Sequence, residues 1–117
     1  MMERKYADYA VEQACALLAI DSPSGFTARA AQWVKDAFSA LGYPAEITQK
    51  GGVLIDLGGE DAVDGLFLEA HSDTLGAMVS EIKSSGHLKL TNLGGLRAEN
   101  AETENVRVYT RAGKVYE

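Results

Sequence analysis

The chain is poor in the residues that usually mark cross-links or reactive sites. Its 117 residues include one cysteine, Cys15, so no internal disulfide can form, and we expect a reducing, cytoplasmic environment. No second cysteine or adjacent base activates this thiol, and we expect it to be a small buried or half-buried apolar residue of a helix. Only two histidines are present, so a site built on imidazole has few places to form.

Basic charge and long apolar runs are also scarce. Eleven basic residues against 17 acidic ones give a net charge of -6, which argues against nucleic acid and anionic membrane surfaces as partners. No apolar run reaches the length of a signal peptide core or a membrane span. We therefore expect a soluble domain with a single modest hydrophobic core.

Two stretches near the N-terminus have helical periodicity. From Tyr6 to Ile20 apolar residues recur at helical spacing, and the following Asp-Ser-Pro-Ser-Gly sequence ends the helix. A second helix is predicted with Thr27 as its N-cap and Gly42 at the C′ position. Its apolar stripe is continuous and consists of Ala30, Trp33, Val34, Ala37, Phe38 and Leu41.

Beyond Pro44 the apolar period shifts towards two, which predicts strands. We expect strands at 45–49 and 53–57, a hairpin around Ser84-Ser85-Gly86, and a second hairpin within 106–116 whose last strand is cut short, which suggests truncation. Residues 66–70, Leu-Phe-Leu-Glu-Ala, predict a buried strand because their apolar side chains point to both faces. The expected fold is α/β, with two N-terminal helices and a mixed β-sheet.

His71 follows this buried strand, and Asp73 lies two residues further on. An imidazole that binds a divalent ion usually donates its other ring N–H to a carboxylate, and Asp73 is close enough to be that carboxylate. We expect His71 at the C-terminal end of a central strand, with its ring near Asp73. A catalytic zinc takes three protein ligands plus water, so one His and one Asp form an incomplete site.

The bare pattern leaves a structural role for His71 open. A His-x-Asp pair is common by chance, and a histidine beside a buried strand is more often a hydrogen-bonded structural residue. His87 follows a hairpin turn and is predicted to be a solvated strand residue. Ser22 and Ser24 have no Gly-x-Ser-x-Gly setting and no catalytic partner, so a serine hydrolase is not indicated.

The wider context of His71 resembles one enzyme family. The relevant residues are 66–79, Leu-Phe-Leu-Glu-Ala-His-Ser-Asp-Thr-Leu-Gly-Ala-Met-Val, and the Leu93-Gly94-Gly95 step. Together they resemble the glutamyl aminopeptidase and endoglucanase-like family. These proteins are cytoplasmic dinuclear metallopeptidases that assemble into tetrahedral particles. The resemblance extends back to Ser24-Gly25-Phe26 and forward to the hairpin within 106–116, so it covers essentially the whole chain.

The resemblance implies that His71 binds one of two divalent metal ions, commonly zinc or cobalt, and that Asp73 is the catalytic-site carboxylate that orients it. It also implies that the bridging Asp, the Glu pair with the general base, and a later Asp and His lie beyond residue 117. Residues 1–96 would be the N-terminal part of a catalytic α/β domain of the zinc-exopeptidase type, and 97–117 the start of an inserted β-domain. The complete enzyme would remove N-terminal residues from peptides, whereas this chain alone is expected to be inactive and to bind no metal tightly.

Two local departures and one alternative accompany this interpretation. Thr74-Leu75-Gly76 stands where family members often have Glu-Ile-Gly, and Leu96-Arg97-Ala98-Glu99 stands where Trp or Phe followed by Asp is usual. A truncated sheet would expose strand edges, so we expect the chain to form a homo-oligomer. The alternative is a non-enzymatic α/β binding or assembly module in which His71 is structural.

Overall fold

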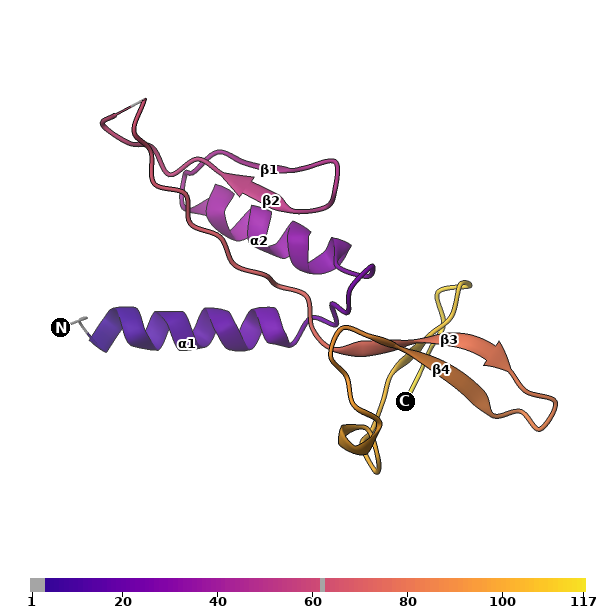
Figure 1. The fold of residues 1–117 in the computed structure, drawn as a ribbon. Coiled ribbons are helices and arrows are strands. Elements are labelled where there is room, and N and C mark those ends of the chain that lie inside the picture. Colours follow the sequence, from indigo (N-terminus) through magenta and orange to yellow (C-terminus); the bar gives the residue numbers. More distant parts are fainter. Residues whose placement is uncertain (1–3, 62) are drawn as a thin grey trace. The chain divides into compact units, whose positions relative to one another are not determined.

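The computed structural model describes residues 4–61 and 63–117 and divides the chain into two compact units that meet between Leu75 and Gly76. Both helices and antiparallel β-hairpins are present (Figure 1), which is compatible with the predicted α/β class. The predicted boundary between a catalytic part and an inserted part, at 96/97, does not coincide with the junction of the two units and stays a prediction.

Both predicted helices are present in the first unit. α1 spans Arg4–Leu18 and α2 spans Ala28–Ala40. Gly42 has a φ of 90° just after α2, a left-handed conformation that glycine adopts without the strain a Cβ would cause. Thr27 occupies the N-cap position, but its side chain makes no capping hydrogen bond, so that part of the prediction is wrong. Neither of these described helices is long and apolar enough to cross a membrane.

The hairpin of the first unit joins β1 (Ala45–Ile47) to β2 (Val53–Ile55) in antiparallel register. Its turn contains Gly51 with a φ of 84° and lies between the two predicted strands. α2 packs on both strands (Figure 1). The half-buried residues Val53 and Ile55 share one face of β2, as the period of two predicted.

The second unit contains two further antiparallel hairpins. β3 (Gly76–Ile82) pairs with β4 (Leu88–Leu93), and the register shifts at a bulge between Val79 and Glu81. β5 (Val108–Tyr109) pairs with β6 (Val115–Tyr116).

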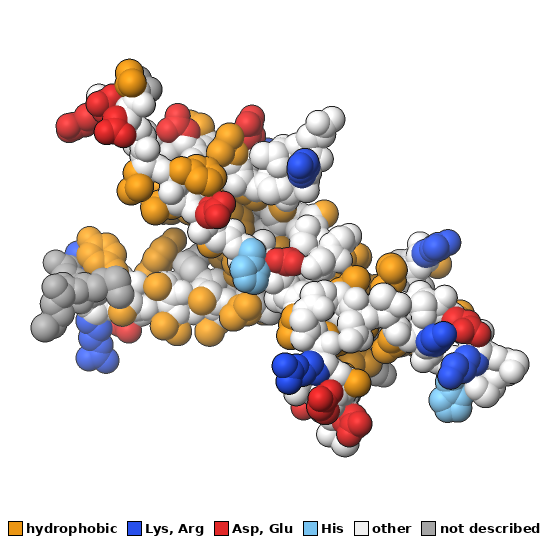
Figure 2. All heavy atoms as spheres, viewed as in Figure 1, with side chains coloured by type: hydrophobic (Ala, Val, Ile, Leu, Met, Phe, Trp, Pro, Cys, Tyr) orange, Lys and Arg blue, Asp and Glu red, His pale blue; other side chains and the backbone are white. Residues whose placement is uncertain are grey.

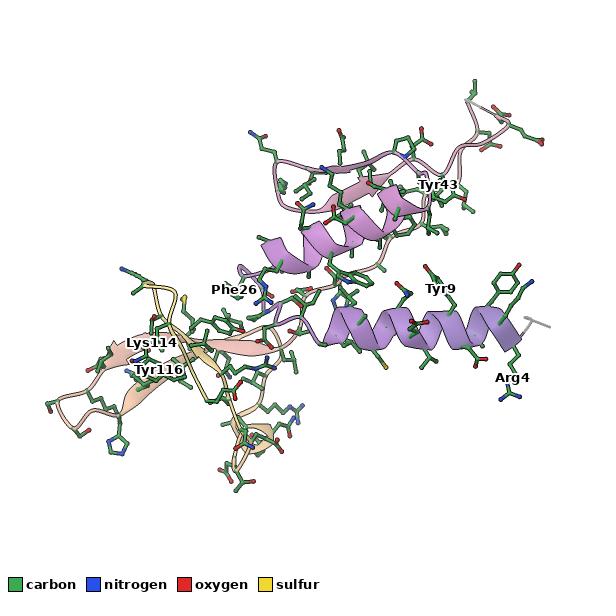
Figure 3. All side chains as sticks on the ribbon, turned by 180° about the vertical axis from the view of Figure 1, so that it is seen from behind. Arg4, Tyr9, Phe26, Tyr43, Lys114 and Tyr116 are labelled. Carbon is green, nitrogen blue, oxygen red and sulfur yellow. The ribbon has the colours of Figure 1, made fainter. Side chains whose placement is uncertain are left out.

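A short 3₁₀ helix, η1, spans Ala98–Asn100 in the connection between the two hairpins. In the C-terminal hairpin, Lys114 Nζ lies 4.5 Å from the centre of the Tyr116 ring (Figure 3). Three separate two-stranded sheets thus take the place of the predicted mixed sheet in the described part of the chain.

The buried strand predicted at 66–70 is absent from the structure. Residues 65–70 have no regular secondary structure (Figure 1). The side chains of Leu66, Phe67 and Leu68 are largely exposed. A strand that is apolar on both faces needs a paired neighbour and cover on each side, and the described residues supply neither.

The hydrophobic core is correspondingly small. Ala30 and Ala31 of α2 are the buried apolar residues of the described chain, and Ser22 is the buried polar residue. Cys15 is exposed, which contradicts the expected burial, because α1 has no buried residue on any face. The apolar side chains drawn in orange along α1 in Figure 2 belong to a helix whose Tyr6, Tyr9, Val11 and Leu18 are all exposed.

Candidate metal-ligand site at His71

The candidate site forms where two loops of the first unit meet. Pro23, just after α1, forms an isolated parallel bridge with Thr74. The Thr74 N–H donates to the Ser22 carbonyl at 2.9 Å, and the Ser22 hydroxyl donates to the Ser72 carbonyl at 3.1 Å. Because Ser22 is buried, these bonds are partly shielded from water, and they hold the two loops together.

The Pro23-Ser24-Gly25 sequence, in the loop after α1, forms the turn that positions Ser24. The Phe26 N–H donates to the Pro23 carbonyl at 2.7 Å, and Gly25 has a φ of 85°. Glycine in this left-handed conformation at the third position of a four-residue turn is typical of type II. Ser24 is the second residue of the turn, and its side chain extends to the loop that carries Asp73.

Asp73 accepts hydrogen bonds from two side chains. The Ser24 hydroxyl donates to Oδ2 at 2.5 Å, and His71 Nδ1 lies 3.0 Å from Oδ1. The hydrogen bond from Ser24, followed by the one from His71, lowers the pKa of Asp73 below its ordinary value. Both bonds favour the ionised form, so Asp73 is a carboxylate anion at neutral pH.

The oxygen atoms around His71 define which ring nitrogen carries hydrogen. Nδ1 lies near Asp73 Oδ1 and, at 3.2 Å, near the Asp73 carbonyl oxygen, and both of these atoms can only accept. Nδ1 is therefore the N–H of the neutral ring, and Nε2 has a free lone pair. The imidazole is 86% exposed, and both imidazoles of the chain are visible at the surface in Figure 2.

This arrangement has the chemistry of one metal ligand with its carboxylate partner. A metal-binding imidazole typically donates its second ring N–H to a carboxylate, which fixes the tautomer. A zinc site needs at least three protein ligands, and no group of three His, Cys, Asp or Glu side chains suited to hold an ion occurs among residues 4–61 and 63–117. One imidazole with its carboxylate therefore fits a divalent ion only as part of a larger donor set.

The same hydrogen bonds exclude a serine-hydrolase arrangement. In a Ser-His-Asp triad the histidine lies between the other two and takes the proton of the serine. Here Asp73 lies in the middle, and Ser24 donates its hydrogen to the carboxylate. Among the described residues, the only base that this hydroxyl is seen to contact is thus the Asp73 carboxylate, and its lowered pKa makes it too weak to activate Ser24 as a nucleophile.

Comparison with known proteins identifies the family. The profile of the M42 glutamyl aminopeptidases matches residues 51–117. The chain belongs to this family. The M42 match contains His71 and Asp73, whereas Ser24 lies outside it.

Two curated relatives extend the likeness to an M42 peptidase over most of the chain. The putative aminopeptidase YhfE of Bacillus subtilis (strain 168) is 37% identical over 100 residues, which cover 86% of this chain and 29% of that protein. The glutamyl aminopeptidase of Lactococcus lactis subsp. cremoris (strain MG1363) is 30% identical over 100 residues, which cover 85% of this chain and 28% of that protein. The M42 chain described here thus spans less than a third of the length of either relative.

The structure brings His71 and Asp73 into hydrogen-bond contact, as the sequence predicted. The prediction that His71 ends a central strand is wrong, because 66–70 forms no strand. The contact of Ser24 with Asp73 was not predicted, since the two residues lie 49 positions apart in the sequence. The turn sequence was the only local sign that the Ser24 side chain would be held in one place. His87 is exposed, as expected, and its Nδ1 lies 2.9 Å from the Ser85 hydroxyl.

Proposed function

We propose that this chain contributes one ligand, His71, to the metal centre of a divalent-metal aminopeptidase. The observation that carries the proposal is the 3.0 Å contact between His71 Nδ1 and Asp73 Oδ1, which leaves Nε2 with a free lone pair. Membership of the M42 family and the aminopeptidase names of both relatives support the peptidase assignment. The metal centre would contain two ions, zinc or cobalt, which supply Lewis-acid activation of a peptide carbonyl.

The residues of this chain have two proposed tasks at the metal centre. His71 would bind one ion through Nε2, and Asp73 would hold the ring in the tautomer and orientation that this requires. Asp73 is thus a positioning residue that acts through His71. The substrates would be peptides, from which the whole enzyme removes N-terminal residues, and a cytoplasmic location is part of the same proposal because a lone cysteine suits a reducing compartment.

Cobalt binding followed by NMR tests the ligand role. Paramagnetic Co²⁺ broadens the signals of groups close to it, so we expect the His71 ring signals to broaden before those of His87. His71→Ala should remove the response, and His87→Ala, which removes the other exposed imidazole, should leave it intact. Equal broadening at both histidines would contradict a specific role for His71.

The activity of the chain alone is a separate test. With zinc or cobalt added, we expect no measurable turnover of amino-acid anilides by the 117-residue chain, because one imidazole and its carboxylate supply neither a general base nor a full ligand set. Turnover that a chelator and His71→Ala both abolish would show that the site needs no further groups.

The alternative function, a non-enzymatic binding or assembly module, requires a structural role for His71. An imidazole that is 86% exposed packs against little, which favours the ligand role. The module predicts that Co²⁺ leaves the His71 signals unchanged and that His71→Ala lowers the free energy of unfolding.

A further inference from the structure

The two histidines of the chain have similar neighbours with different hydrogen-bonding capacity. Each ring places Nδ1 near a side chain two positions away in the sequence: His71 contacts the Asp73 carboxylate, and His87 contacts the Ser85 hydroxyl. A hydroxyl can donate or accept, so Ser85 is compatible with either neutral tautomer of His87. An ionised carboxylate can only accept, so Asp73 is compatible only with hydrogen on Nδ1 of His71.

The Asp73 carboxylate can select the tautomer only if it stays where it is. Its side chain is 40% exposed, so without a second partner it could turn about the Cβ–Cγ bond and exchange His71 for water. Its second oxygen is held by the Ser24 hydroxyl at 2.5 Å. The serine itself stands in a turn that is closed by the Phe26-to-Pro23 hydrogen bond.

We propose that Ser24 is a positioning residue for His71: its hydroxyl fixes the Asp73 carboxylate, so that the imidazole is held as the Nδ1–H tautomer with Nε2 as the ligand atom. The line of contacts runs from the turn after α1, through Ser24 and Asp73, to the ring. The use of Nε2 as a ligand rests on the proposed function, whereas the tautomer is a property of the metal-free chain. An experiment can therefore contradict the ligand role of Nε2 without contradicting the role of Ser24, and the reverse also holds.

Ring ¹⁵N shifts of the intact 117-residue chain measure the tautomer without metal or substrate. At about pH 9, well above the pKa of an imidazole in a model peptide, the shifts of the two ring nitrogens give the ratio of Nδ1–H to Nε2–H. In the wild type we expect His71 to be mainly Nδ1–H, and His87 to keep the Nε2–H preference of an unrestrained imidazole. A His71 ring that is mainly Nε2–H would overturn the proposal before any substitution is made.

Ser24→Ala isolates the role of the hydroxyl. We expect the Nδ1–H to Nε2–H ratio of His71 to fall by roughly three- to tenfold, the scale of one part-exposed hydrogen bond to a charged group. Ser24→Thr retains a hydroxyl and should restore the ratio. An unchanged ratio in Ser24→Ala, or no recovery in Ser24→Thr, would overturn the proposal.

Two matched serine variants separate this effect from general loosening of the fold. Ser85→Ala removes the partner of His87 and should change the His87 shifts alone. Ser22→Ala removes the other serine hydroxyl that joins the two loops, the one bonded to the Ser72 carbonyl, and should leave the His71 ratio near its wild-type value. If the His71 ratio falls as far in Ser22→Ala as in Ser24→Ala, the placement of the loops, and not the Ser24 hydroxyl, sets the tautomer. If the ratios behave as proposed but Co²⁺ does not broaden His71, the proposed function fails and the role of Ser24 stands.

Discussion

Two apolar stretches of the first unit differ sharply in how much of their surface they bury. α2 and the β1–β2 hairpin pack on one another, and α2 contains the two buried alanines of the described chain. Residues 65–70 follow them in sequence with an even denser apolar pattern, yet no strand forms there. The helix and hairpin have their packing partners nearby in the sequence, whereas a strand that is apolar on both faces depends on partners from elsewhere. Apolar content alone therefore does not decide which segment forms a helix or strand.

The largest expected effect concerns association. Exposed apolar chain recruits partners, so we expect the chain to self-associate at micromolar concentration through residues 66–68. Leu68→Asp should shift the chain towards monomer in sedimentation or light scattering. Leu18→Asp is the matched control, because Leu18 is 69% exposed and Leu68 73%, but Leu18 lies in a helix and offers no free backbone edge.

Either of two results would contradict this prediction of association through residues 66–68. If the wild-type chain is a monomer with cooperative unfolding, the exposed segment is not an association surface. If Leu18→Asp dissociates the chain as effectively as Leu68→Asp does, association follows exposed apolar area in general and not the unpaired segment.

An intermediate effect is expected from overfilling the packed region. Ala30 has no exposed surface, so Ala30→Leu should force side chains or backbone apart and lower the free energy of unfolding by about 1–3 kcal/mol. Ala40→Leu places the same side chain at an exposed position of the same helix and should change the free energy of unfolding by less than about 0.5 kcal/mol. Urea unfolding followed by helical circular dichroism measures both. Equal effects would mean that α2 is not packed as described.

The smallest effect comes from two glycines, one in each stretch. Gly42→Ala places a Cβ at a φ of 90° and should cost about 1 kcal/mol of unfolding free energy. Gly65 precedes the exposed segment, and a Cβ there would meet no atom within 4 Å, so Gly65→Ala should be nearly neutral. The same urea titration compares them, and a larger cost at Gly65 would show that the segment is more restrained than its exposure indicates.

The parts of the fold that sequence predicted are those whose signals are local. The apolar stripe of α2 and Gly42 after it predicted that helix nearly to its ends. The Ser84-Ser85-Gly86 sequence predicted the turn between β3 and β4, where Gly86 has a φ of 84°. The strand at 66–70 and the burial of Cys15 were predicted wrongly, because burial depends on which other segments cover a residue, and periodicity does not report that.

The candidate site divides in the same way. The contact between His71 and Asp73 could be predicted from a separation of two residues, and in the structure His71 Nδ1 lies 3.0 Å from Asp73 Oδ1. The contact of Ser24 with Asp73 could not be predicted, because nothing in the local sequence of either residue points to the other.

The bridge between Pro23 and Thr74 also has consequences for the order of folding. The hydrogen bond from Ser22 to Ser72 closes a loop across 50 positions, and closing this loop costs conformational entropy. We expect the bond to form only after α2 and its hairpin have folded, because they shorten the path between the ends of the loop. The surroundings of His71 should thus be among the last parts of the first unit to form and the first to open. Because closure entropy grows only with the logarithm of loop length, doubling the loop would add just ~0.6 kcal/mol. Insertions between β2 and Gly65 should accordingly spare the site, whereas one extra residue in the turn at Ser24 would displace the hydroxyl from its carboxylate.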